Sequence, residues 1–288
     1  MKNQFPSNGQ HESDKKIVVI KIGGSSIAGE ERLKEFASEI SAIVTAGLMP
    51  VIVHGGGPEI TEEMQRRGLP VRKVAGLRVT DAAALEVAVD VLTAINGRIV
   101  CALEAAGVKA VGMMGSECDT VLCRRMPPAT VKDDQGRELV VDLGLVGEVV
   151  QVHPARLRTL LRSGSVPVVF PICGSAPDEL MNVNADTAAA HIARALKADQ
   201  LVLITDVPGL MMEMGNEDTI IPMLRSSDFD YLVRRGIVTG GMIPKVEACR
   251  IAVEGGVRMA HMIDGKGEGS IVAQLLSGNH AGTRMIKG

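Results

Sequence analysis

Two glycine-rich segments beside charged residues are the first places in this sequence where chemistry could occur. Lys21 is followed by Gly23 and Gly24, directly after the apolar run Ile17–Ile20. Glycines at the end of a strand let backbone N–H groups approach a phosphate, and a lysine can neutralise charge on transferred oxygens. The segment matches neither G-x-x-x-x-G-K-[ST] nor G-x-G-x-x-G. Taken alone, it is equally well interpreted as a tight turn.

The second segment is His54 followed by three glycines and Pro58, after the apolar run Met49–Val53. Three consecutive glycines cost conformational entropy unless something must lie against the backbone. Two such loops at the carboxyl ends of parallel strands would face one crevice, where open α/β sheets bind ligands. We therefore predict a phosphate cradle that includes Gly56 and Gly57, and a structural, hydrogen-bonding role for His54.

Arginine and asparagine residues follow further along the chain. Arg78 precedes Thr80 and Asp81, either of which can cap the long helix that follows. An arginine can fork around a carboxylate with two hydrogen bonds, although a lone arginine is more often a surface residue. Asn182 and Asn184 alternate with apolar residues and should point the same way.

The remaining chemical candidates lie in the C-terminal third. Asp186 either caps a helix or holds nearby lysines in place. Thr205-Asp206 and Gly209 follow an apolar run, and a second Gly-Gly precedes Lys245 at a predicted helix start. This last pattern suggests a second phosphate contact, although either lysine alone could equally be solvated.

Short runs that are apolar on both faces alternate with helical patterns along most of the chain. Such alternation predicts an open, mainly parallel α/β sheet. The predicted strands are Ile17–Ile20, Met49–Val53, Val108–Met113, Val166–Phe170, Leu201–Ile204 and Met259–Ile263. The predicted helices are Glu31–Ala46, Asp81–Ala106, Pro154–Arg162, Ala185–Leu196, Ser227–Arg235 and Ile243–Glu254.

One stretch, Cys118–Val150, breaks the alternation with turn signals among short Val-rich pieces, and we interpret it as an inserted β-hairpin or meander. We expect two lobes of one chain, with a boundary near residue 175: a disordered tail at 1–16, an N-lobe at 17–175 and a C-lobe at 176–288.

Composition excludes several classes of function. A formal charge of −3 and a pI of about 6.1 lack the positive charge that nucleic-acid binding needs. With no Trp, one Tyr and four Phe, the chain has almost no rings for base stacking. No apolar run approaches the roughly 18 residues of a membrane span. The polar N-terminus does not resemble a secretory signal.

The five cysteines are odd in number and form no C-x-x-C pair, so neither a disulfide framework nor a zinc site is predicted. Buried, reduced thiols are the simplest expectation. They favour a reducing compartment, and we expect a cytoplasmic protein.

Taken in order, these segments resemble the amino acid kinase family. The matching stretches are VVIKIGG, VIVHGGGP, GLRVTD, VDLGLVG, MNVNADTAAA, LITDVPGL, TGGMIPK and GTRMI, which run from residue 17 to 286. The resemblance implies an open three-layer sandwich: a mainly parallel central sheet with helices on both faces. It also implies an N-lobe that binds an acylated amino acid and a C-lobe that binds ATP.

Within that family, the chain is most similar to members that phosphorylate the γ-carboxylate of N-acetyl-L-glutamate in arginine biosynthesis. By motif, Lys21 and Lys245 resemble the lysines that stabilise the transferring phosphoryl group, and Asp186 the acid that orients them. Gly24, Gly56 and Gly57 resemble its backbone donors. Arg78 and Asn182 resemble the residues that hold the acceptor. Gly23 and Thr205, Asp206 and Gly209 fall in the segments expected to contact ATP.

The resemblance implies ATP and Mg²⁺, the latter bound mainly through the nucleotide's phosphates, with no residue assigned as a metal ligand. Two segments, Gly112–Thr120 and Ser175–Leu180, depart from the family pattern. Carrier-linked α-aminoadipate, aspartate or a small phosphate therefore stay open as acceptors. The alternative from another functional class is a non-catalytic sensor of a nucleotide or an amino acid. The presence of both lysines and Asp186 argues against it, because a sensor would not need them.

Arginine-inhibited members of the family carry an N-terminal amphipathic helix that links dimers into a hexamer. Residues 1–16 contain Pro6, Gly9 and too few apolar residues for such a helix. We therefore expect a homodimer that is insensitive to arginine and has no nitrogen-signalling protein partner.

Overall fold

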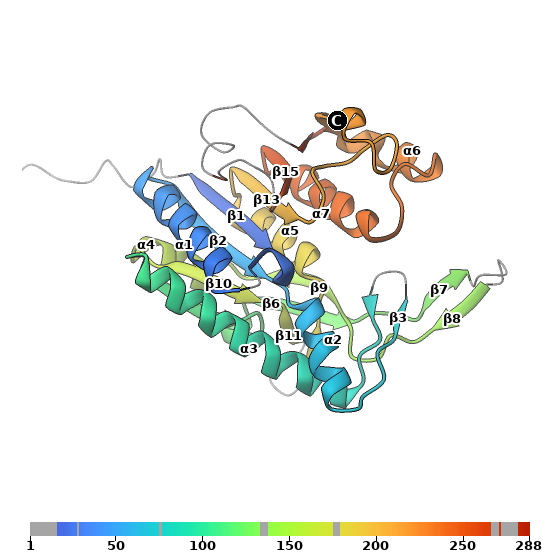
Figure 1. Ribbon diagram of the computed structural model, residues 1–288, viewed down its shortest axis with the longest axis horizontal. Helices are drawn as coiled ribbons and strands as arrows, with labels where there is room; N and C mark the ends of the chain where they lie inside the picture. The colour runs from blue at the N-terminus through green and yellow to red at the C-terminus, as the bar shows by residue number, and fades with distance from the viewer. Residues whose placement is uncertain are drawn as a thin grey trace, which may run out of the picture.

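An eight-stranded sheet runs through the middle of the molecule (Figure 1). The computed structural model describes residues 16–27, 29–74, 77–132, 138–174, 179–265, 271 and 282–288. In spatial order, the strands are β14 (Met223–Arg225), β16 (Thr283–Ile286), β15 (Met259–Asp264), β13 (Gln200–Thr205), β1 (Ile17–Ile22), β2 (Met49–His54), β10 (Val166–Phe170) and β5 (Ala110–Met114). The six strands predicted from apolar runs are its parallel members, and β16 runs antiparallel to β15.

The alternating side chains of each central strand enter two different hydrophobic cores. In β1, Val18 and Ile20 face one core, whereas Val19 faces the other, and all three are fully buried. Because successive side chains in a strand point to opposite faces, Lys21 shares the face of Val19, and His54 in β2 shares the face of Ile52. These two orientations position the chemistry described below.

Helices cover both faces of the sheet, which confirms the predicted three-layer sandwich (Figure 1). One core packs against α1 (Glu30–Thr45), α2 (Gly57–Arg66) and α3 (Ala82–Ala105). The opposite core packs against α4 (Ala155–Arg162), α5 (Ala185–Leu196), α6 (Phe229–Arg234) and α7 (Ile243–Glu254). Asp81 caps α3 and its side chain accepts a hydrogen bond from Ala84 N at 2.8 Å, as one of the two proposed caps.

The helix α2 was not among the predicted helices, which is a correction to the sequence analysis. Its N-cap is Gly56, and Pro58 lies in its first turn, where a missing N–H costs nothing. Only two of its residues, Ile60 and Met64, are buried, and they lie one turn apart. Two apolar positions are too few to produce a detectable helical period, so the sequence carries no signal for this helix.

The inserted stretch forms more than a hairpin. Its central strands, β7 (Ala129–Lys132) and β8 (Glu138–Val141), do pair as an antiparallel ribbon that projects from the body (Figure 1). Its outer strands, β6 (Val121–Arg125) and β9 (Gly147–Val152), join β11 (Ile172–Gly174) and β12 (Leu180–Asn182) in a separate four-stranded sheet. A short ribbon of β3 (Lys73–Val74) and β4 (Leu77–Arg78) completes the strands.

Two further expectations need correction. The helix expected at Ser227–Arg235 is a 3₁₀ turn at Ser226–Asp228 followed by α6. Of the cysteines, all unpaired, Cys101 and Cys118 are exposed rather than buried. Among the described residues, no helix has the length and apolar character needed to cross a lipid bilayer.

The two predicted lobes share one continuous sheet, because β1 pairs with β2 on one side and with β13 on the other. The predicted boundary near residue 175 falls within 175–178, which lie outside the described residues, as does the predicted tail up to residue 15.

Candidate functional site

A cavity of about 280 Å³ lies where β1 and β2 end and α5 begins. Open α/β sheets bind ligands at this edge, beyond the carboxyl ends of their parallel strands. Nine of the predicted site residues line this central cavity: Lys21, Gly23, Gly24, Gly56, Gly57, Arg78, Asn182, Asp186 and Asp206. Residues from five separate segments of the sequence are therefore brought together at one place.

Asp186 lies between two lysines. The Lys21 ammonium is 2.8 Å from Asp186 Oδ1, and the Lys245 ammonium donates a hydrogen bond to Oδ2 at 3.3 Å. Asp186 is in the first turn of α5, whereas the cap of this helix is Asn184, whose side chain accepts a hydrogen bond from Thr187 N. Of the two interpretations of Asp186, the acid that holds lysines is thus the one that the geometry supports.

These charges are nearly shielded from water. The side chains of Lys21 and Asp186 are 9% and 7% exposed, and that of Lys245 is 24% exposed. Burial by itself would raise the pKa of Asp186, but the two ammonium groups outweigh it and hold that pKa below its usual value. Asp186 is therefore ionised, and the group carries one net positive charge at the cavity wall.

The two glycine loops pack tightly against their surroundings. A Cβ on Gly24 would collide with the carboxylate of Glu59 in α2. A Cβ on Gly56 would come within 2.6 Å of Ile95 and 2.9 Å of Leu92, both in α3. Gly55 N–H donates to Ile22 O at 3.1 Å and so joins the two loops. The missing side chains allow the backbone to form the wall of the cavity.

Arg78 lies at the end of β4 and is buried, with 8% of its surface exposed. Its Nη2 donates hydrogen bonds to Gly57 O at 2.9 Å and to Thr61 Oγ1 at 2.7 Å, and its Nη1 contacts Met64 Sδ at 3.2 Å. Burial lowers the pKa of Arg78 from its very high usual value. A buried guanidinium fixed against α2 and lining the cavity is suited to bind a carboxylate.

Asn182 is connected to Arg78 through the hydroxyl of Thr80. Asn182 Nδ2 donates to Thr80 Oγ1 at 3.4 Å, and Thr80 Oγ1 donates to Arg78 O at 3.0 Å. Thr80 is fully buried, and its backbone pairs with Gly144 of the inserted stretch. Asn182 and Arg78 therefore belong to one hydrogen-bonded unit, although 104 positions separate them in the sequence.

Three predicted site residues, Lys245, Thr205 and Gly209, are not among the described residues that line the cavity, and Lys245 is connected to it through its hydrogen bond to Asp186. The Thr205 hydroxyl is buried and donates to Val207 O at 2.6 Å, which stabilises the turn after β13. A Cβ on Gly209 would lie 2.9 Å from Thr283 Oγ1, so this glycine allows two segments to pack closely. Within LITDVPGL, only Asp206 reaches the central cavity.

A second cavity of about 400 Å³ adjoins the first and shares Leu77, Val146 and Asn184 with it. The segment TGGMIPK contributes to its wall through Gly240, Gly241, Ile243 and Pro244. No residue of the divergent segment Gly112–Thr120 is among the described residues that line either cavity. The other divergent segment falls partly at 175–178, outside the described residues.

The sequence analysis did not identify Lys73, which lines the central cavity and pairs with Arg78 across the β3–β4 ribbon. Local composition gave no signal for this position, because it does not specify the register that places Lys73 opposite Arg78.

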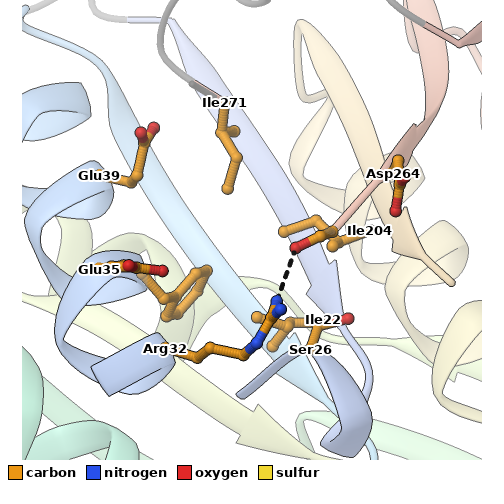
Figure 2. A pocket seen from close by; sticks show the side chains of 10 residues that line it. Ile22, Ser26, Arg32, Glu35, Glu39, Ile204, Asp264 and Ile271 are labelled. Atoms are coloured by element: carbon orange, nitrogen blue, oxygen red, sulfur yellow. Dashed lines mark hydrogen bonds between the residues drawn. The ribbon is translucent and has the colours of Figure 1, made fainter. Parts of the chain in front are cut away.

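A third cavity, of about 300 Å³, lies beside α1 and contains none of the predicted site residues. Figure 2 shows Arg32 reaching from α1, where its Nη1 donates to Gly265 O at 3.5 Å, with Glu35 and Glu39 on the same helix. Neither glycine loop nor the two lysines reach it. The candidate active site is therefore the central cavity.

Comparison with known proteins agrees with this geometry. Residues 16–264 match the amino acid kinase family. The acetylglutamate kinase of Methanothrix thermoacetophila is 43% identical over 93% of this chain and 91% of its own length. That of Desulfitobacterium hafniense is 38% identical over 93% of this chain and 90% of its own length.

Solved structures show the same fold. An N-acetylglutamate synthase from Neisseria gonorrhoeae, solved with coenzyme A and N-acetyl-glutamate, superposes with a TM-score of 0.79 at 24% identity, over 95% of this chain and 60% of that one. Giardia carbamate kinase superposes with a TM-score of 0.69 at 19% identity, over 96% of this chain and all of that one. On the match along most of its length, the chain belongs to the amino acid kinase family.

Proposed function

We propose that this protein transfers the γ-phosphoryl group of ATP to the γ-carboxylate of N-acetyl-L-glutamate. The observation that carries the proposal is the Lys21–Asp186–Lys245 group, of which the buried Lys21 and Asp186 line a cavity walled by two glycine loops. The relatives named acetylglutamate kinase, at 43% and 38% identity over nearly the whole chain, support the choice of acceptor.

The chemistry requires alignment and charge neutralisation more than acid–base catalysis. A carboxylate is already a competent nucleophile at neutral pH, so no general base has to act. Lys21 and Lys245 stabilise the charge on the oxygens of the transferring phosphoryl group. Asp186 holds both ammonium groups 2.8 and 3.3 Å from its own oxygens, which fixes their positions before ATP arrives.

Backbone N–H groups of Gly24, Gly56 and Gly57 provide the remaining donors to the phosphoryl oxygens. Arg78 and Asn182 hold the α-carboxylate and the amide end of the acceptor, and Thr80 keeps them in register. Residues 17–175 would then provide the acceptor subsite and residues 176–288 the nucleotide subsite, with ATP also contacting Gly23 and the turn after β13.

Mg²⁺ fits this site as an ion that enters with the nucleotide. In phosphoryl-transfer sites it is usually held by one or two carboxylates, water and substrate phosphates. Asp206 contributes a carboxylate to the lining of the central cavity. Asp206 would therefore hold the ion, directly or through water. When bound, the ion neutralises phosphate charge.

The test is release of ADP by the purified protein with MgATP and a panel of acceptors: N-acetyl-L-glutamate, L-aspartate, α-aminoadipate, N-acetylaminoadipate and L-glutamate. Selective turnover of N-acetyl-L-glutamate is the expected result. Turnover of another acceptor would retain the kinase chemistry and refute the proposed acceptor. Binding of ATP without turnover of any acceptor would favour a sensor.

We also propose a cytoplasmic homodimer, insensitive to arginine and without a nitrogen-signalling protein partner, on the basis of composition and residues 1–16. Light scattering coupled to size exclusion should give a mass near twice 30.4 kDa. A mass near six chains, or inhibition by arginine, would contradict this assembly.

A further inference from the structure

A buried polar contact lies directly behind the second glycine loop. His54 ends β2, and its side chain is fully buried on the face of the sheet that α3 covers. Its Nε2 lies 3.0 Å from Nδ2 of Asn96 in α3, and its Nδ1 lies 3.1 Å from Gly55 O. Neither His54 nor Asn96 is among the residues that line the central cavity. Gly55, which His54 contacts, does line the cavity and so connects the pair to it.

The hydrogen positions in this contact follow from the partners of Asn96. Its second neighbour is Val168 O, 2.9 Å from the same Nδ2 atom. A carbonyl oxygen can only accept, so the atom facing it must be the amide nitrogen, which carries two hydrogens and accepts none. One hydrogen goes to Val168 O and the other to His54 Nε2. His54 must therefore accept at Nε2 and carry its proton on Nδ1.

The environment maintains this protonation state. Burial lowers the pKa of His54 to about 4, despite the opposing effect of the hydrogen bond with Gly55. The imidazole is therefore neutral at physiological pH. Asn96 is in turn fixed by close packing, because its amide group occupies the space that a Cβ on Gly112 in β5 would fill. The result is one Nδ1–H donor aimed at the carbonyl of Gly55.

That carbonyl belongs to the peptide that also carries the N–H of Gly56. Among the described residues every peptide is trans, and in a planar trans peptide the C=O and the following N–H point in opposite directions. Holding Gly55 O toward His54 therefore directs Gly56 N–H away from the ring. Gly55 N–H is held as well, by Ile22 O at 3.1 Å. A run of three glycines would otherwise have several peptide orientations available.

We propose that His54 and Asn96 are positioning residues, which orient the Gly55–Gly56 peptide so that Gly56 N–H faces the phosphoryl group in the central cavity. The expected effect on kcat rests on the proposed phosphoryl transfer. The orientation of the Gly55–Gly56 peptide does not depend on which acceptor is phosphorylated. A buried Asn–His pair is thus the means by which α3, which carries Asn96 about four turns into the helix, controls the cradle.

The protonation state can be measured in the unmodified protein. Two-bond ¹H–¹⁵N spectra of ¹⁵N-histidine-labelled protein should show the His54 resonances with a protonated Nδ1 and an unprotonated Nε2 between pH 6 and 8. The spectrum of His54→Asn identifies these resonances among the six histidines. A proton on Nε2, or averaging between the two tautomers, would overturn the proposal.

Two substitutions separate positioning from simple stability. An Asn side-chain amide replaces the Nδ1 edge of an imidazole and a Gln amide the Nε2 edge. His54→Asn should therefore retain a donor for Gly55 O, whereas His54→Gln should not. Loss of one preorganised donor lowers kcat by about 10²–10³-fold. Because His54→Gln would misorient this donor rather than remove it, we expect kcat to fall by about 10- to 100-fold, with little change in the KM of the acceptor. His54→Asn should lose clearly less.

The matched control is His261→Gln, a second buried histidine on the same face of the sheet, in β15. It should lower the melting temperature as His54→Gln does, without the fall in kcat. Equal losses of kcat in His54→Asn and His54→Gln, or losses that follow the melting temperature in all three variants, would refute a positioning role.

A binding measurement distinguishes failure of this proposal from failure of the proposed function. The Gly56 amide resonance should shift on addition of a non-hydrolysable MgATP analogue or inorganic phosphate to the wild-type protein, and less in His54→Gln. If the wild type proves inactive with every acceptor but the Gly56 resonance behaves in this way, only the proposed function fails. An unshifted Gly56 resonance in protein that binds the non-hydrolysable MgATP analogue would refute the positioning role.

Discussion

The ammonium of Lys21 lies 2.8 Å from Oδ1 of Asp186, and the two side chains come from β1 and α5, 165 positions apart in the sequence. Both are nearly excluded from water, so neither charge is stable in its place without the other. The contact links the fold of the sheet to the charge of the active site, and several experiments can separate the two roles.

Asp186→Asn should damage both stability and activity. It leaves the buried Lys21 without a counter-ion, and breaking a buried ion pair costs about 3–5 kcal/mol. It also leaves two ammonium groups without a common anchor, so we expect kcat to fall by at least about 100-fold. Urea unfolding and steady-state kinetics measure the two effects. The control is Arg124→Gln, which removes an exposed pair with Glu148 and should cost less than about 1 kcal/mol.

Lys21→Met and Lys245→Met should have similar effects on kcat but different effects on stability. Each removes one charge from the transferring phosphoryl group, with an expected loss of about 10²–10³-fold in kcat. Lys21 is the more deeply buried partner of Asp186, so its loss should destabilise the fold more. The exposed Lys34→Met on α1 is the control. Wild-type kcat in either lysine variant would contradict the proposed charge stabilisation.

Arg78→Lys should raise the KM of the acceptor, because a lysine cannot reproduce hydrogen bonds to Gly57 O and Thr61 Oγ1 while binding a carboxylate. We expect an increase of about tenfold or more, corresponding to roughly 1.4 kcal/mol. The measurement is the KM of N-acetyl-L-glutamate at saturating ATP. Arg66→Lys, at an exposed arginine of α2, should change nothing. An unchanged KM in Arg78→Lys would remove Arg78 from the acceptor site.

Gly56→Ala should destabilise the protein through packing against α3. The added Cβ would lie 2.6 Å from Ile95 Cδ1, and overpacking of this kind costs about 1–3 kcal/mol. Ile95→Val removes that methyl group, so the double variant should recover part of the loss in a double-mutant cycle. Gly57→Ala, which has nothing within 4 Å of its added Cβ, should leave stability unchanged. Additive losses in the cycle would exclude this contact as the cause.

Stability should fall in mild acid because two histidines are held neutral. The pKa values of His54 and His191 are both lowered to about 4, chiefly by burial. The unfolded chain binds these protons near pH 6.5, so the folded state loses stability as the pH drops from 6.5 to 4. His54 alone accounts for roughly 3 kcal/mol of this loss. Unfolding in urea at several pH values should show the slope, and His54→Asn should reduce it.

The sheet and most helices could be predicted because their local signals are strong. Ile17–Ile20 and Leu201–Ile204 are continuous apolar runs, and Ala185–Leu196 has a helical period with an Asn cap. The segments of the site could be found from glycines, lysines and the match to a family pattern. The face of β1 on which Lys21 lies could also be predicted, because side chains along a strand alternate between its two faces.

Other features depend on contacts that a sequence does not display. Asn96 is one polar residue within the largely apolar helix α3, and only the neighbouring Val168 carbonyl and His54 ring reveal its task. Thr205 has the composition of a ligand-binding turn, yet its hydroxyl closes that turn internally. Lys73 enters the cavity through its pairing with Arg78, a register that local composition does not specify.

The place of β1 between β2 and β13 has a consequence for biosynthesis. Val18 pairs with Pro50 on one side, but its partner on the other side is Gln200. At about 5–20 residues per second, a ribosome needs some ten seconds or more to make the intervening chain. During that interval one edge of a strand that is apolar except for Lys21 has no partner, which is the condition under which strands of different molecules associate. The nascent chain therefore exposes this strand edge until the second half of the sheet emerges.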